Sequence, residues 1–429
     1  MNIQAKLELG NQAFLNWRKI SFEERQKLFS KMAELMRSDV DKYAVTITKE
    51  MHKPITQSIA EINKTAGMLD YYANCENVLA PENIETEFNV SEVHHAPLGI
   101  ILGVMPWNFP FWQVLRFAVP AILAGNVVVL KHASICFGTG RLIEELFVQA
   151  GFPEAVFQNF EVGHKEIQEI LESPYVQGVS LTGSGKAGGE VASIAGKNIK
   201  RSVLELGGSD AYIVLDDAEI LKAAKEAPRG KLQNTGQVCN AAKRFLVQKS
   251  VENEFIPAFV EEYKTYVPGD PMDKNTRISK MARKDLADEL LAQYDKAIAN
   301  GAEIVLPLER LSDQELKPGI IKVKAGNPIL QEELFGPLAM LMVGETDEEL
   351  LTLANDIPFG LGNAIWTKDK KRAQFFIDNL DSGTVSINKS TSSDARLPFG
   401  GAKQSGYGVE LSTVALKEFT ITKTIVGNI

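Results

Sequence analysis

Apolar residues follow a helical spacing in the first part of the chain and a strand-like pattern at its end. Between Phe22 and Thr48 they recur at every third or fourth position, which predicts an amphipathic helix, and residues 55–79 predict a second one. Residues 84–97 mix polar and valine positions and predict a pair of strands. The tail, residues 415–429, is rich in β-branched side chains and predicts β structure.

From Gly99 onwards, short apolar runs alternate with helical stretches. Such runs are typical of strands that are buried on both faces of a parallel sheet. The predicted strands are residues 99–104, 126–130, 176–182, 202–206, 211–215 and 244–247, and the predicted helices include 137–150, 188–195, 218–231 and 251–266. Residues 306–318 and 386–406 are rich in turn formers and predict loops. The alternation predicts an α/β protein whose parallel sheets carry helices on both faces.

Composition and charge mainly exclude some classes of protein. A chain of 429 residues predicts two or three domains, and 45% hydrophobic with 24% charged residues is typical of a globular protein. The net charge of −9 argues against a broad nucleic-acid contact. The most apolar stretch, residues 100–130, is interrupted by prolines, asparagines and an arginine, so no membrane span is expected. Three cysteines form no disulfide framework, which predicts a cytoplasmic protein.

Cys239 is the candidate nucleophile. It lies among polar residues and glycine in segment 234–240, which is typical of a thiol presented from a loop, whereas Cys75 and Cys136 are interpreted as small buried side chains. A thiolate attacks a carbonyl when a base removes its proton. The five histidines show no site spacing, so the predicted base is Glu205, which lies between two leucines at a predicted strand end. Burial there would make it a useful base, and a glutamate that reaches solvent is the alternative.

Asn108 is the candidate oxyanion donor. It lies between two prolines in segment 106–110, directly after the predicted strand 99–104. Ligands gather at the carboxyl ends of parallel strands, and an amide fixed at such a turn suits an oxyanion hole. An asparagine that only forms the turn is the alternative.

Seven short segments carry a family resemblance. They are PWNFP (106–110), VLK (129–131), TGS (182–184), LELGG (204–208), GQVC (236–239), EELFGP (332–337) and PFGG (398–401). Each is weak alone, but all seven in this order resemble the NAD(P)-dependent aldehyde dehydrogenase superfamily over essentially the whole chain. The resemblance implies an α/β, aldehyde dehydrogenase-like fold with two Rossmann-like parallel-sheet domains and a small β oligomerisation element.

The resemblance also implies a covalent mechanism at Cys239. Cys239 would attack the aldehyde, Asn108 and the backbone N–H of Cys239 would stabilise the oxyanion, and Glu205 would activate the water that releases the acid. No metal is implied. The positions that match the family's cofactor site are Met105, Pro106, Trp107, Lys131, Ser134, Gly163, Gly183, Ser184, Leu206, Gly207, Glu333 and Phe335.

Three residues predict the substrate and the cofactor. Arg116 and the segment 393–399 resemble the succinate-semialdehyde dehydrogenases, so Arg116 and the Ser393 hydroxyl are expected to hold the carboxylate of succinic semialdehyde. A structural ion pair is the alternative for Arg116. Ser134 stands where many family members have an acidic residue, which predicts NADP as the preferred cofactor with measurable NAD activity. A Ser134 side chain that caps the helix near Phe137 is compatible with that role.

The same resemblance divides the chain. Residues 1–83 and 99–206 are expected to form the cofactor-binding domain and residues 207–412 the catalytic domain. Residues 84–98 and 413–429 are expected to form the oligomerisation strands of a homodimer or homotetramer.

Three hypotheses stay open for the activity. The first is an aldehyde dehydrogenase acting on succinic semialdehyde, or on another short aliphatic aldehyde or semialdehyde. The second is a non-catalytic structural member of the fold, which the joint presence of Cys239, Glu205 and Asn108 disfavours. The third passes the acyl group to coenzyme A, whereas a base at Glu205 favours hydrolysis. Family members usually begin with short strands before the first helix, so the first sheet is expected to be trimmed here.

Overall fold

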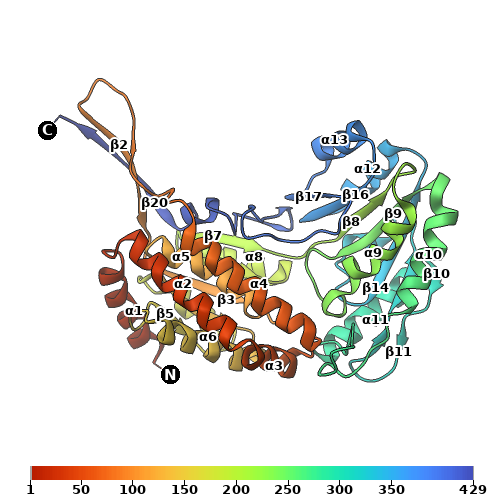
Figure 1. Cartoon of the computed structure of the whole chain (residues 1–429), viewed down its shortest axis with the longest axis horizontal. Helices are drawn as coiled ribbons and strands as arrows, with labels where there is room; N and C mark the ends of the chain where they lie inside the picture. The colour runs from red at the N-terminus through yellow and green to blue at the C-terminus, as the bar shows by residue number, and fades with distance from the viewer. Residues whose placement is uncertain (1, 429) are drawn as a thin grey trace.

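The computed structural model describes residues 2–428 as two α/β lobes with a β arm that projects from them (Figure 1). In Figure 1 the first lobe contains the red, orange and yellow helices, and the second contains the green, cyan and blue helices α9 to α13. The chain ends, Met1 and Ile429, belong to the expected ranges 1–83 and 413–429 but lie outside the described residues.

A six-stranded sheet with the order β19-β7-β6-β3-β4-β5 forms the centre of the first lobe. All neighbouring strands are parallel except the pair of β19 and β7. The strands are β3 (Ile100–Met105), β4 (Val127–His132), β5 (Phe157–Asn159), β6 (Val176–Thr182), β7 (Arg201–Glu205) and β19 (Gly406–Tyr407). The helices are α1 (Ile3–Trp17), α2 (Phe22–Ser38), α3 (Val40–Met51), α4 (Ile55–Asn74), α5 (Trp112–Leu123), α6 (Phe137–Ala150), α7 (Glu166–Glu172) and α8 (Gly185–Lys197).

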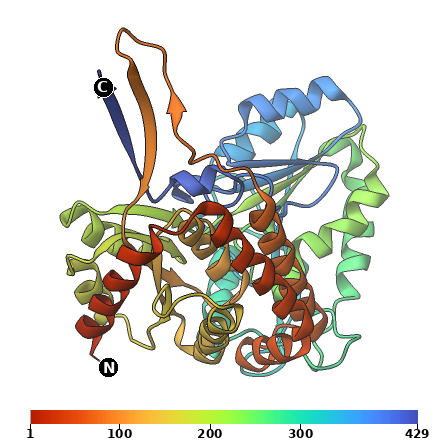
Figure 2. The same cartoon turned by 60° about the vertical axis from the view of Figure 1, so that its left-hand side comes forward.

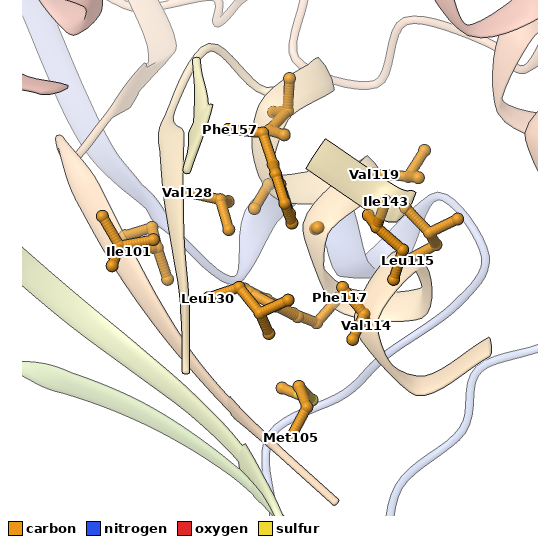
Figure 3. Packing of buried hydrophobic residues seen from close by; sticks show 14 of the residues in the cluster. Ile101, Met105, Val114, Leu115, Phe117, Val119, Val128, Leu130, Ile143 and Phe157 are labelled. Atoms are coloured by element: carbon orange, nitrogen blue, oxygen red, sulfur yellow. The ribbon is translucent and has the colours of Figure 1, made fainter. Parts of the chain in front are cut away.

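The core of the first lobe forms because β3, β4 and α5 are mostly apolar and almost entirely buried. All residues of β4 and of α5 are buried. Figure 3 shows Leu130 of β4 and Leu115 and Ile143 of the covering helices pointing into the same interior. Each such side chain contributes about 1.5–3 kcal/mol when it leaves water, so this packing fixes the carboxyl ends of the strands.

A seven-stranded sheet with the order β10-β13-β14-β9-β8-β16-β17 forms the centre of the second lobe. Only β10 runs antiparallel to its neighbour. The strands are β8 (Asp210–Val214), β9 (Ala242–Gln248), β10 (Glu303–Leu306), β13 (Gly319–Lys322), β14 (Leu338–Gly344), β16 (Gly362–Trp366) and β17 (Thr384–Ile387). The helices are α9 (Ile220–Leu232), α10 (Glu252–Lys264), α11 (Lys284–Ala299), α12 (Asp347–Asn355) and α13 (Lys370–Asn379). Two small pairs lie outside this sheet, β11 (Glu309–Arg310) with β12 (Leu316–Lys317), and β15 (Phe359–Gly360) with β18 (Ala402–Lys403).

The arm is a three-stranded antiparallel sheet made from two distant segments. Its strands are β1 (Glu82–Asn83), β2 (Val90–Pro97) and β20 (Thr420–Gly427). The pairing of β2 with β20 runs from Val90 opposite Gly427 to Pro97 opposite Thr420. Figure 2 shows the arm standing away from both lobes.

The predicted α/β fold with parallel sheets is confirmed, but two predicted elements are wrong. The single helix expected over residues 22–48 is two helices that meet at Asp39, whose backbone (φ −112°, ψ 23°) leaves the helical region. Aspartate favours such breaks because its side chain competes for nearby backbone groups, and the apolar spacing on both sides hides the break. The strand pair expected over residues 84–97 is wrong in its bounds. These residues contain one strand, Val90–Pro97, which pairs with β1 just before the expected range and, on its other side, with β20 of the C-terminal tail.

Other differences concern helix ends and an element that was not predicted. The helix expected over residues 55–79 ends at Asn74. The loop expected over residues 306–318 contains the small β11–β12 pair. Helix α1 was not predicted, and its start is fixed by Asn2, whose side chain accepts a hydrogen bond from Ala5 N–H at 3.1 Å.

Candidate active site

Hydrogen bonds fix the loop that carries Cys239. The loop follows α9 and a short turn, Gln233–Gly236, and leads into β9. The N–H of Asn234 donates to Gln57 Oε1 at 2.7 Å. Gln237 Nε2 donates to the Asn234 carbonyl at 2.9 Å, and Gln237 Oε1 accepts from Ala282 N–H at 3.0 Å. Cys239 is therefore presented from an ordered loop, as its polar sequence context predicts.

The backbone before Cys239 is strained. Asn234 and Thr235 have φ of 50° and 57°, and Gly236 has φ of 80°. For a residue other than glycine this region costs on the order of 1–3 kcal/mol and persists only where the surroundings enforce it. A Cβ on Gly236 would overlap the backbone of Gly336, so only glycine fits there. The strain shows that packing, rather than local preference, sets the position of the thiol.

The Cys239 thiol keeps its proton at neutral pH. The surrounding protein displaces water and raises the pKa of Cys239 to about 11. The charges of Lys243 and Arg116 lower that pKa, whereas those of Glu333 and Glu205 raise it. Because the thiolate is the nucleophile, a base has to remove the proton.

Glu205 has the properties of that base. It is the last residue of β7, it is only 2% exposed, and neither carboxyl oxygen has a hydrogen-bond partner among the described residues. Burial raises the pKa of Glu205 well above its ordinary value, the charge of Arg116 lowers it, and the charge of Glu410 raises it. A Cβ on Gly208 would lie 2.8 Å from the Cys239 carbonyl oxygen, so the strand end and the nucleophile loop run side by side. Glu205 does not reach solvent, and its unpartnered carboxylate is available to accept a proton.

Asn108 lies in the turn after β3, against the nucleophile loop. Its Nδ2 donates to the Gln237 carbonyl at 3.0 Å, and its own carbonyl accepts from Asn234 Nδ2 at 3.0 Å. His132, at the end of β4, holds the same turn through a contact of 3.1 Å between its Nε2 and the Pro110 carbonyl. Burial lowers the pKa of His132 to about 4, so the ring is neutral and has a structural role in holding the turn.

A cavity of about 740 Å³ leads from the start of α8 to Cys239. Its lining joins both lobes, because α8 belongs to the first sheet and α11 to the second. The predicted residues that line it are Pro106, Trp107, Asn108, Gly183, Ser184, Leu206, Gly207, Cys239, Glu333 and Phe335. Segments that are far apart in the chain thus meet in one cavity.

Four residues predicted for the cofactor lie outside this lining: Met105, Lys131, Ser134 and Gly163. Lys131 ends β4 together with His132, and it takes part in no ion pair within the described residues. Burial lowers the pKa of Lys131, and the charge of Glu166 opposes this. Gly163 is next to the same Glu166, since a Cβ on Gly163 would lie 3.1 Å from a Glu166 carboxyl oxygen.

Ser134 is exposed and does not cap a helix. It begins a short turn, Ser134–Cys136, and α6 begins at Phe137 without a side-chain cap hydrogen bond. The capping role considered for Ser134 is therefore wrong, and the hydroxyl stays available for a ligand.

Arg116 forms a buried ion pair. Its side chain is 3% exposed, and its Nε contacts a carboxyl oxygen of Glu410, whose side chain is 2% exposed. Its Nη2 donates to Thr182 Oγ1 at 3.4 Å, and its guanidinium carbon lies 4.7 Å from the ring centroid of Phe399. The ion pair considered as the alternative for Arg116 is thus present in the structure.

Ser393 also has a partner. It lies in the loop between β17 and β18, and its Oγ accepts a hydrogen bond of 2.8 Å from Lys64 Nζ of α4. No local pattern connects a helix near the start of the chain with this loop.

Three residues near the site were missed from the sequence: Lys64, Lys243 and Glu410. Lys243 is fully buried, donates to the Val238 carbonyl at 2.7 Å and to the Cys239 carbonyl, and lies 3.2 Å from Glu333. A lysine at the start of an apolar strand carries the same signal that singled out Glu205, since buried charges need partners. The partner of Arg116, by contrast, is separated from it by most of the chain, and no local pattern marks it.

Among residues 2–428, no three or more His, Cys, Asp or Glu side chains come together as a metal site. Within the same residues, no helix is both long enough and apolar enough to cross a membrane.

Comparisons with known proteins agree with this geometry. The model of the aldehyde dehydrogenase family matches residues 1–425. The chain is 40% identical to the succinate-semialdehyde dehydrogenase [NADP(+)] of Deinococcus radiodurans, over 99% of this chain and 90% of the relative. It is 39% identical to the succinate semialdehyde dehydrogenase [NAD(P)+] Sad of Escherichia coli, over 99% of this chain and 93% of the relative.

A solved structure gives the same result. The crystal structure of succinic semialdehyde dehydrogenase from Streptococcus pyogenes, in complex with NADP+, matches with a TM-score of 0.95 and 35% identity, covering 98% of this chain and 94% of that one. A family model that spans nearly the whole chain, relatives of this identity and a shared architecture lead to one conclusion. The chain belongs to the aldehyde dehydrogenase family.

Proposed function

We propose that this protein oxidises succinic semialdehyde to succinate through a thioester on Cys239, with NADP as the preferred cofactor. The observation that carries the chemistry is the unpartnered, buried carboxyl group of Glu205 beside the nucleophile loop. A buried polar group without a partner is costly and calls for an explanation, which a role as a base beside the nucleophile supplies for Glu205. The substrate is supported by the names of the relatives from Deinococcus radiodurans and Escherichia coli, and NADP by the name of the first, whereas that of the second gives NAD(P)+.

The chain's own residues account for the addition step. Glu205 takes the proton of the Cys239 thiol, whose raised pKa would otherwise leave little thiolate at neutral pH. The thiolate attacks the aldehyde carbon, and the oxygen gains negative charge. Asn108 Nδ2 and the backbone N–H of Cys239 donate to that oxygen, which stabilises the charge without reorganisation.

Glu205 acts again in the release of the acid. NADP, when bound, supplies the group that accepts the hydride as the adduct becomes a thioester. After the thiol proton has passed from Glu205 to solvent, Glu205 takes a proton from water, the resulting hydroxide attacks the thioester carbon, and the Cys239 sulfur leaves as a thiolate. A base in this position favours water over coenzyme A as the acyl acceptor.

The residues around the cavity fit a dinucleotide. Ser184 is the N-cap of α8, and a Cβ at Gly185 would meet nothing within 4 Å, so open space lies in front of the helix start. Such a helix start favours a pyrophosphate, because its free N–H groups and dipole attract anions. Pro106, Trp107 and Phe335 add apolar and aromatic surface to the same cavity, with the Trp107 and Phe335 ring centroids 5.9 Å apart.

The preference for NADP rests on Lys131 and Ser134. The Lys131 ammonium has no carboxylate partner within the described residues, and the Ser134 hydroxyl is exposed. A 2′-phosphate would receive a charge-assisted hydrogen bond from the lysine and a further one from the hydroxyl. An acidic residue at 134 would repel the same phosphate.

The test is an aldehyde panel with both cofactors, with and without coenzyme A. We expect the highest kcat/KM for succinic semialdehyde with NADP, free succinate as the product, and no change when coenzyme A is added. A higher kcat/KM for butanal would contradict the proposed substrate, and formation of succinyl-coenzyme A would contradict the hydrolytic step.

We also propose that the β arm joins copies of the chain in a homo-oligomer, in the cytoplasm. Six consecutive residues of β20 are exposed, among them the apolar Ile421, Ile425 and Val426. Exposed apolar residues on a projecting strand are typical of a strand that packs against another subunit. Light scattering of the full chain, and of an Ile425→Lys variant, tests this proposal through the measured mass.

A further inference from the structure

Lys64 is a cation without a carboxylate partner, on the same side of the site as Arg116. Lys64 is an exposed residue of α4. Its ammonium lies 4.1 Å from the ring centroid of Trp112, and Trp112 follows Asn108 by four residues in the chain. Its Nζ donates to the Ser393 hydroxyl at 2.8 Å. Within residues 2–428 it forms no ion pair, so an ammonium with three donors has one protein acceptor and one aromatic face.

The carboxylates near Lys64 are already committed to other groups. Glu61 accepts from the N–H groups of Phe111 and Trp112 at 3.0 and 3.1 Å, and its second oxygen pairs with Lys53. Asp394 pairs with Arg396 at 2.7 Å. None of these groups neutralises Lys64.

The same holds for the carboxylate that faces Arg116. Glu410 contacts Arg116 through one oxygen and accepts from Ser180 Oγ at 3.1 Å through the other. Because Arg116 is buried and its charge is balanced by Glu410, Lys64 is the cation that a substrate anion can still neutralise.

We propose that Lys64, together with the Ser393 hydroxyl, binds the carboxylate at the far end of the semialdehyde substrate. This inference rests on the proposed function and adds a residue that decides specificity. Trp112 and Phe399 supply ring surface on this side of the site, one against Lys64 and one against Arg116. An uncharged aldehyde gains nothing from the ammonium, whereas a carboxylate gains a charge-assisted hydrogen bond.

The electrostatics of Lys64 give the inference a pH signature. Displacement of water by the surrounding protein and, second, the charge of Arg116 lower the pKa of Lys64 to about 8. The charges of Glu61, Asp394 and Cys239 oppose that shift. The ammonium binds an anion only while it is protonated, so KM for the semialdehyde should rise as the pH increases through the pKa of Lys64. KM for butanal, which has no carboxylate, should not follow that profile.

The experiment compares succinic semialdehyde with butanal in the full-length enzyme and in Lys64→Met, Lys64→Arg and Lys389→Met. Lys389→Met is the matched control, because Lys389 is an exposed lysine on the same loop as Ser393. In Lys64→Met we expect the preference for succinic semialdehyde over butanal to fall roughly tenfold to hundredfold, mainly through KM. Lys64→Arg should keep much of the preference, and Lys389→Met all of it.

Inhibition by succinate provides a second readout. Succinate should inhibit butanal oxidation competitively in the parent enzyme, and much more weakly in Lys64→Met. If the parent prefers succinic semialdehyde and Lys64→Met keeps that preference and its succinate inhibition, the assignment of Lys64 is wrong while the proposed function stands. If the parent shows no preference for succinic semialdehyde over butanal, both the proposed function and this inference fail.

Discussion

The two sides of Cys239 are built in different ways. The side proposed for the cofactor consists of strand ends and a helix start, where Pro106, Gly183 and Leu206 each follow directly on a strand of the same sheet. The side proposed for the substrate consists of side chains from segments far apart in the chain, such as Lys64 of α4, Arg116 of α5 and Ser393 of a late loop.

This difference explains what each side can be used for. The carboxyl ends of parallel strands meet at one edge of the sheet whatever their side chains are. The fold alone therefore sets the positions of the residues on the cofactor side. The other side depends on which acidic and basic side chains form ion pairs. Glu410 pairs with Arg116 and Glu61 pairs with Lys53, so Lys64 stays available for a ligand. We infer that changes of substrate arise from re-pairing charges on this side, with the cofactor side left intact.

The largest expected effect comes from removing the nucleophile between the two sides. Cys239→Ala should lower aldehyde oxidation by at least ~10⁴-fold, because no other group can form the covalent adduct. The Kd of NADP, measured by fluorescence titration, should stay unchanged, since the cofactor side is independent of the thiol. Cys75→Ala is the control and should stay active. Residual turnover in Cys239→Ala close to that of the parent enzyme would contradict the covalent mechanism.

The next effect separates the two uses of Glu205. Glu205→Gln should lower kcat by about 10²–10⁴-fold and show a burst of NADPH, because hydrolysis of the thioester needs the base more than hydride transfer does. Stopped-flow absorbance measures the burst. Glu418→Gln is a matched control, since burial also raises the pKa of Glu418, but its Oε1 already accepts a hydrogen bond from Val409 N–H at 2.9 Å. A slow steady state without a burst would place the role of Glu205 before the thioester.

The raised pKa values give the parent enzyme a pH dependence of known sign. Glu205 is a base only when deprotonated, and burial raises its pKa, so kcat should fall as the pH decreases through that raised value. The thiol pKa of Cys239 is about 11, so kcat/KM should still rise above neutral pH as thiolate becomes more abundant. A rate that is independent of pH from mildly acidic to alkaline conditions would contradict both assignments.

The same comparison shows how much the sequence could predict. The parallel strands and the positions of Cys239, Glu205 and Asn108 on a loop, a strand end and a turn follow from local patterns, and the structure has them there. The break at Asp39 could not be seen, because apolar spacing continues across it. The partners of β2, Arg116 and Ser393 could not be seen either, because each lies far away in the chain and no periodicity encodes such a pairing.

The buried ion pair on the substrate side predicts a stability effect. Arg116→Met should lower the free energy of unfolding by about 3–5 kcal/mol, because Glu410 is left as a buried charge without a cation. Arg116→Met/Glu410→Gln should recover part of the loss. Urea unfolding measures both variants.

The matched control for that prediction is a surface pair. Arg396→Met removes the partner of Asp394 and should change the free energy of unfolding by only ~0–1 kcal/mol, because the Arg396 side chain is 74% exposed and water screens the pair. Equal changes in the free energy of unfolding for Arg116→Met and Arg396→Met would show that the ion pair of Arg116 and Glu410 does not stabilise the fold. Arg116 would then be free to hold the substrate carboxylate.

The smallest effect concerns the cofactor side, where a single exposed residue sets a preference. Ser134→Glu should shift the ratio of kcat/KM for NADP over NAD by roughly tenfold to hundredfold towards NAD. The new carboxylate repels a 2′-phosphate but accepts a hydrogen bond from a 2′-hydroxyl, while Lys131 stays in place. Ser134→Ala is the control and should lose only the hydroxyl's share of that preference. A parent enzyme that already prefers NAD would contradict the role of Ser134. The ratio of kcat/KM for succinic semialdehyde over butanal should be the same in all three proteins, because Ser134 lies on the other side of the site.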